Sequence, residues 1–159
     1  MQPGLKHLAE PIHLFAMGFG AGLVPLAPGT AGSALAMLPA WLMFELSLPL
    51  RIGIVVLTVL VGTWCCGESA RRLGVHDHPA IVLDEIAAML MLSVLLPPQP
   101  AWLLGAFVFF RVFDIAKPWP IRDVDHRMKG GTGIMLDDLL AAVYAAACLQ
   151  MINLFLTAA

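Results

Sequence analysis

The sequence is poor in charged residues. Asp, Glu, Lys and Arg make up only 13% of its 159 residues, whereas hydrophobic types make up 60%. A soluble domain usually carries about a quarter charged residues, and one of this length could not bury so much apolar surface in a single core. The composition therefore predicts a protein surrounded by lipid. The net charge of −2 and the lack of a basic tract with interleaved aromatics predict no nucleic-acid partner.

Cysteine is also scarce. Cys65, Cys66 and Cys148 form no C-x-x-C motif and lie within apolar runs, which indicates small core residues rather than a metal or redox site. Internal repeats, linkers and low-complexity segments are absent from the sequence. We therefore expect a single domain over residues 1–159.

Nucleotide-binding loops are missing as well. Gly18, Gly20 and Gly22 lack the dinucleotide spacing, so they favour close helix packing, and no Lys follows the glycine of Pro28–Ser33 as a Walker loop requires. Two interpretations of Pro28–Ser33 stay open. Its hydroxyls, including that of Thr30, could cap the next helix, or its amides and hydroxyls could bind an anion.

Long apolar runs predict the helices. We expect them over residues 34–46, 52–72, 81–96, 101–116 and 133–159. The last is uncharged from Leu139 onward and satisfies the roughly 20 residues needed to cross a bilayer. The shorter ones span it only if their polar ends reach the interface. The predicted fold is an all-α polytopic membrane bundle.

The polar segments alternate between two faces of this bundle. One face collects residues 25–33, 71–80, 111–130 and the start of the final helix, while the other has residues 47–50, 97–100 and the C-terminus. Seven of the nine basic residues fall on the first face. Basic residues favour the cytoplasmic side of membranes, so we expect the polar site at the cytoplasmic end.

Five carboxylates enter this end from three predicted helices. They are Asp84, Glu85, Asp114, Asp137 and Asp138. Unpaired, they would repel one another and be costly at membrane depth. Carboxylate oxygens suit a hard cation, so we interpret the five as candidate catalytic residues and Mg²⁺ ligands.

Basic residues lie beside these acids in the sequence. Arg111, Lys117 and Arg122 suit phosphate binding, with Thr30 as a lesser contact. Mg²⁺ with basic side chains is the usual equipment of phosphoryl transfer. In the adjoining loop, His76 is a candidate proton donor to a leaving group, although a simple surface loop is the favoured interpretation.

Two other interpretations remain open at this point. Acids at helix starts and bases at helix ends also complement helix dipoles, so each residue taken singly could be structural. A small transporter or ion-channel subunit could use the same carboxylates as an ion path.

Four stretches together resemble a known family. They are PGTAGS at 28–33, GVHDH with IVLDE at 74–85, RVFDIAKPWPIR at 111–122 and GTGIMLDD at 131–138. In this combination and order the chain resembles the phosphatidylglycerophosphatase A family over most of its length. Two positions depart from the family pattern, Ala31 for a bulkier residue and Ala88 for a glycine, and neither removes a charge.

The resemblance implies a bacterial inner-membrane, Mg²⁺-dependent lipid phosphatase. Such an enzyme would hydrolyse phosphatidylglycerophosphate to phosphatidylglycerol and phosphate, with its site facing the cytoplasm and the acyl chains of its substrate remaining in the bilayer. The oligomeric state stays open.

Overall fold

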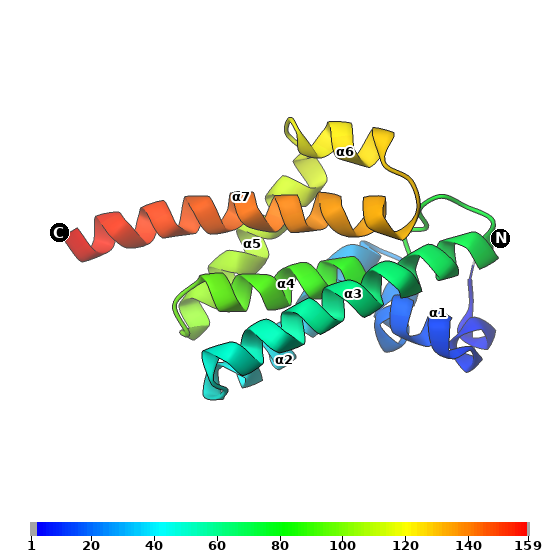
Figure 1. Cartoon of the computed structure of the whole chain (residues 1–159), viewed down its shortest axis with the longest axis horizontal. Coiled ribbons are helices and arrows are strands. Elements are labelled where there is room, and N and C mark those ends of the chain that lie inside the picture. The colour runs from blue at the N-terminus through cyan, green and yellow to red at the C-terminus, as the bar shows by residue number, and fades with distance from the viewer. Residues whose placement is uncertain (1–2, 159) are drawn as a thin grey trace.

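The computed structural model describes residues 3–158, and every regular element in that part of the chain is helical. Figure 1 shows the arrangement. The elements are η1 (Leu5–Ala9), α1 (Pro11–Ala16), η2 (Gly18–Leu23), α2 (Pro28–Leu42), η3 (Met43–Glu45), α3 (Leu48–Leu73), α4 (Leu83–Leu95), α5 (Pro100–Ala116), α6 (Ile121–Arg127) and α7 (Gly130–Ala158). The all-α prediction is confirmed.

Helix α4 is the centre of the bundle. It packs against α2, α3, α5 and α7, and it places the fully buried Met89 and Leu92 in the core. Phe110 of α5 fills the same core, and α7 adds small residues such as Ala141 and Ala145 that let helices approach closely. Figure 1 shows α3, α4 and α7 running alongside one another, with the C-terminal turns of α7 projecting beyond the rest.

Two helices are long and apolar enough to cross a membrane. These are α3, with 26 residues, and α7, with 29 residues. At about 1.5 Å per residue each exceeds the roughly 30 Å hydrocarbon core of a bilayer. Large apolar side chains are exposed on α3 and on α7, among them Leu60, Trp64 and Phe155. Such a surface fits an all-α membrane protein, because lipid rather than water would cover it.

The start of α2 differs from the prediction. The helix begins at Pro28, so PGTAGS forms its first turns rather than a loop before it. Pro is well suited to the first helical position, where its missing N–H has no partner to lose. The N-cap residue is Ala27, in the left-handed region at φ 52° and without a side-chain cap. Neither Thr30 nor Ser33 therefore caps this helix.

The apolar run of residues 13–24 is not one continuous helix. Phe19 at φ 54° and Gly20 at φ 103° break it between α1 and η2. The expected close packing does occur, but onto the start of α4: a Cβ at Gly18 would meet Val82 at 2.9 Å and Ile86 at 3.0 Å. The N-terminal segment therefore lies against the first turn of α4. A second difference is α6, which lies in the segment between the predicted helices 101–116 and 133–159, where no helix was expected.

Candidate functional site

Three helix ends meet at one end of the bundle and supply its charged side chains. The first turn of α4 carries Asp84 and Glu85, the last turns of α5 carry Arg111 and Asp114, and an early turn of α7 carries Asp137 and Asp138. We call these six residues, together with Lys117 and Asp125, the charged cluster. The convergence of acids from three helices, expected from the alternation of faces, is thus present.

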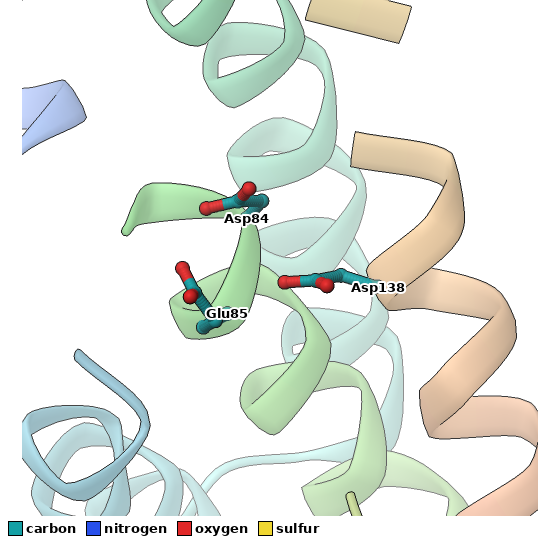
Figure 2. Close-up of side chains that lie close together, drawn as sticks. All are labelled: Asp84, Glu85 and Asp138. Atoms are coloured by element: carbon teal, nitrogen blue, oxygen red, sulfur yellow. The ribbon is translucent and has the colours of Figure 1, made fainter. Parts of the chain in front are cut away.

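Asp84, Glu85 and Asp138 form the tightest group. Each offers one carboxylate oxygen, and the three oxygens lie within 4.8 Å of one another. Figure 2 shows the side chains converging from α4 and α7. Asp84 is only 7% exposed and Asp138 only 4%. Water can therefore do little to relieve the repulsion between these carboxylates.

Several oxygens in this group have no hydrogen-bond partner. Asp84 Oδ1, Glu85 Oε2 and Asp138 Oδ2 are buried and unpartnered within the described structure. Leaving a buried polar atom unpaired costs about 1–3 kcal/mol, and more when it is charged. A hard divalent cation bound between oxygen ligands would offset this cost. The residues present therefore fit a metal ion.

Arg111 lies beside this group. Its Nη1 is 2.7 Å from Asp114 Oδ2 and 3.7 Å from Glu85 Oε1. Its Nε is buried and has no hydrogen-bond partner within the described residues. The guanidinium is thus held by Asp114 and Glu85 while it retains a donor that an anion could occupy.

Lys117 occupies a second position in the cluster. Its Nζ donates to Asp125 Oδ1 at 2.8 Å and to Asp137 Oδ2 at 2.7 Å. Burial alone would lower the pKa of this ammonium, but the hydrogen bonds that it donates to Asp125 and Asp137 outweigh burial and raise the pKa above its ordinary value. Lys117 is therefore a permanent cation at neutral pH.

Comparison with protein families identifies a match over most of the chain. A family model described as Phosphatidylglycerophosphatase A matches residues 14–153, which include every member of the charged cluster. The chain belongs to this family. The residues that match the family model span nearly all of the helical bundle.

Two curated relatives are similar over most of their length. Phosphatidylglycerophosphatase A of Escherichia coli (strain K12) is 44% identical over 148 residues, covering 92% of this chain and 86% of the relative. Phosphatidylglycerophosphatase A of Haemophilus influenzae (strain ATCC 51907 / DSM 11121 / KW20 / Rd) is 44% identical over 140 residues, covering 87% and 86%. No solved structure matches the chain significantly.

In this member of the phosphatidylglycerophosphatase A family, the start of α2 packs directly against the cluster. A Cβ on Gly29 would overlap a carboxylate oxygen of Glu85 and lie 2.9 Å from Arg111 Nη1. Thr30, the next residue, is half-buried in the same turn. PGTAGS therefore forms one side of the cluster, and glycine at position 29 gives the charged side chains their space.

We expect Gly29→Ala to lower phosphatase activity by about tenfold or more, since an added methyl would displace Glu85 or Arg111. Gly53→Ala is the matched control, because a Cβ at this helical position of α3 would meet nothing within 4 Å. Phosphate release from detergent-solubilised proteins measures the effect. Equal activities of the two variants would contradict the assigned role of the close contact.

Other predicted site residues are not brought into the tight group. Asp114 and Asp137 contact basic side chains instead of joining the three oxygens. Arg122 is exposed on α6, and His76 is exposed in the loop between α3 and α4. Neither forms an ion pair with a carboxylate of the cluster among residues 3–158.

Asp125 was missed by sequence reasoning. It lies on α6, where the sequence predicted a loop, and it became visible only through its contact with Lys117. The signal available was its spacing of eight residues from Lys117 across Pro118 and Pro120. That spacing does not specify a contact without knowledge of the turn.

Proposed function

We propose that this chain is a Mg²⁺-dependent phosphatase that hydrolyses phosphatidylglycerophosphate to phosphatidylglycerol and inorganic phosphate. One observation carries the proposal: three carboxylates, each with a buried oxygen that is unpartnered within the described residues, lie beside an arginine with an unpartnered donor. Hard-cation ligands next to an anion ligand suit phosphomonoester hydrolysis, because both stabilise negative charge on the phosphoryl group. Membership of the phosphatidylglycerophosphatase A family supports the choice of substrate.

Asp84, Glu85 and Asp138 are the residues that would hold Mg²⁺. Their oxygens are mutually close and unpartnered, and carboxylates are ligands that Mg²⁺ accepts. The ion, when bound, supplies positive charge that stabilises the transferring phosphoryl group. Asp114 and Asp137 are assigned to holding Arg111 and Lys117, because these are their contacts.

The basic residues bind the substrate phosphate in this proposal. Arg111 donates to phosphate oxygens through its unpartnered Nε, and Lys117 adds a point charge. Thr30 at the start of α2 is a lesser contact, and Arg122 contributes positive charge at the rim. These groups neutralise the phosphate while it is in place.

The reaction itself is a displacement at phosphorus. A water oxygen attacks phosphorus and gives up one proton to solvent, the bond from phosphorus to the glycerol oxygen breaks, and that oxygen takes up a proton. His76 is assigned to donating this proton, since it lies in the loop that leads to Asp84 and histidine is the commonest general acid in enzymes. The two products are the alcohol of phosphatidylglycerol and inorganic phosphate.

We also place the site at the cytoplasmic face of the inner membrane. The apolar side chains exposed on α3 and α7 support bilayer contact, and the basic residues around the cluster support the orientation. With this placement the acyl chains stay in lipid while the head group enters the cluster. A transporter or channel would need polar groups through the bilayer depth, but the far end carries only Glu45 and Arg51 as charged residues of the described chain.

Metal removal tests this function. We expect wild-type protein in mixed micelles to release phosphate with Mg²⁺ and to lose more than about a hundredfold of that rate in excess chelator, with recovery on adding Mg²⁺ back. A rate that is indifferent to chelator would contradict the metal role. Ion flux in proteoliposomes without phosphate release would favour the transporter interpretation.

A further inference from the structure

We propose that Asp125 is a positioning residue that holds the Lys117 ammonium beside Asp137 and so prepares it for the substrate phosphate. The assignment rests on the proposed function, because it acts through a lysine assigned there to phosphate binding. No part of that function assigns a role to Asp125. Its place on α6, outside the three helices that carry the other acids, is what distinguishes it.

The Lys117 ammonium has three N–H donors, and they have different partners. Two of the three ammonium donors are occupied, one by Asp125 at 2.8 Å and one by Asp137 at 2.7 Å. The third donor has no acceptor among the described residues, which leaves it for a ligand. A lysine side chain has about 2 kcal/mol of rotamer entropy, so two fixed acceptors restrict where that third donor lies.

The backbone around Lys117 is fixed as well. Lys117 closes α5 in the left-handed region at φ 40°, its N–H donating to Phe113 O at 2.8 Å. A non-glycine residue in this region is strained, and such residues persist where the surroundings hold them. The following turn is tied to α7, because Tyr144 Oη donates to Trp119 O at 3.0 Å.

Helix α6 completes the arrangement. It packs against α7, and Figure 1 shows it beside the first turns of that helix. Asp125 is 32% exposed and Lys117 is 27% exposed, whereas Asp137 is only 6% exposed. Lys117 therefore lies between a buried acid and a more accessible one, at the margin of the cluster through which a phosphate would enter.

The test compares binding with turnover. We expect Asp125→Ala to raise the KM for phosphatidylglycerophosphate, and the inhibition constant of inorganic phosphate, each about tenfold, with kcat within about threefold of wild type. Asp125→Asn keeps an oxygen that accepts from the ammonium, so both constants should stay within about threefold. Asp123→Asn is the matched control on α6, because Asp123 makes none of the ion pairs found in residues 3–158.

A double-mutant cycle separates positioning from general damage. Lys117→Ala should weaken phosphate inhibition by itself, and adding Asp125→Ala should change it by less than about twofold, because Asp125 acts through the lysine. Asp125→Ser is the second truncation, used if the alanine variant does not fold.

The assignment would be overturned by truncation variants that behave like Asp123→Asn, or by a truncation with an undiminished effect in the Lys117→Ala background. Tighter phosphate inhibition in both Asp125→Ala and Asp125→Asn would also overturn it, because Asp125 would then only oppose the anion. Failure of the proposed function looks different, since wild-type protein itself would then release no phosphate from the lipid.

Discussion

Asp138→Asn should lower kcat for phosphate release about a thousandfold, roughly 4 kcal/mol of lost transition-state stabilisation. Asp138 is almost completely buried and contributes one of the three oxygens that lie within 4.8 Å. Asparagine keeps the shape of the side chain but removes its negative charge, so the proposed Mg²⁺ site loses a ligand of the required kind. The substitution therefore tests the negative charge of Asp138 separately from the packing of its side chain.

The measurement has two parts. Phosphate release gives kcat, and the shift in the thermal unfolding midpoint on adding Mg²⁺ reports ion binding, because a ligand of the folded state stabilises it. Asp138→Asn should remove most of that shift while leaving the Mg²⁺-free protein at least as stable as wild type, since one of several repelling carboxylates is gone. Asp123→Asn makes the same chemical change outside the cluster. Turnover by Asp138→Asn within threefold of this control would refute the assigned role.

Arg111→Lys should lower kcat/KM about a hundredfold although it keeps the positive charge. The guanidinium contacts Asp114 at 2.7 Å and Glu85 at 3.7 Å and still has Nε available. A lysine ammonium is a single point and cannot reproduce this planar set of donors. Loss of one preorganised donor to developing charge typically costs about 10²–10³ in rate.

Arg71→Lys provides the comparison. Arg71 is also paired with an acid, Glu68 at 2.6 Å, but its side chain is 73% exposed. Exposed pairs of this kind contribute little, and Arg71 lies outside the charged cluster, so this variant should keep wild-type activity. The contrast between the two substitutions distinguishes a guanidinium at the proposed phosphate site from one that faces solvent. Equal activity of both variants would show that Arg111 supplies charge alone.

Much of the fold could be predicted from the sequence, because hydrophobic periodicity and length specify helices in lipid. The runs that became α3, α4, α5 and α7 were identified to within a few residues. That Asp84, Glu85, Asp114, Asp137 and Asp138 lie at one end followed from counting which ends of those helices share a face. The sequence did not single out Asp84, Glu85 and Asp138 as the tight group. These predictions depend only on order along the chain.

The remaining features depend on tertiary contacts, which the order of residues along the chain does not specify. The role of Gly29 required knowing that α2 begins at Pro28 and that its first turn touches Glu85 and Arg111. Asp125 required α6, a helix of 7 residues whose place is set by the turn before it. The breaks at Phe19 and Gly20 arise where tertiary packing onto α4 overrides a continuous apolar pattern.

The uneven distribution of charge between the two ends bears on how the chain enters a membrane. On the proposed orientation, insertion carries across the bilayer only the far end, where Glu45 and Arg51 are the charged residues within the described chain. Arg51 is 8% exposed there, its guanidinium donating to Ser93 O and lying 5.6 Å from the Phe44 ring. Moving a charged side chain across the bilayer costs several kcal/mol. The charged cluster avoids this cost, because none of its members has to leave the side on which the protein is synthesised.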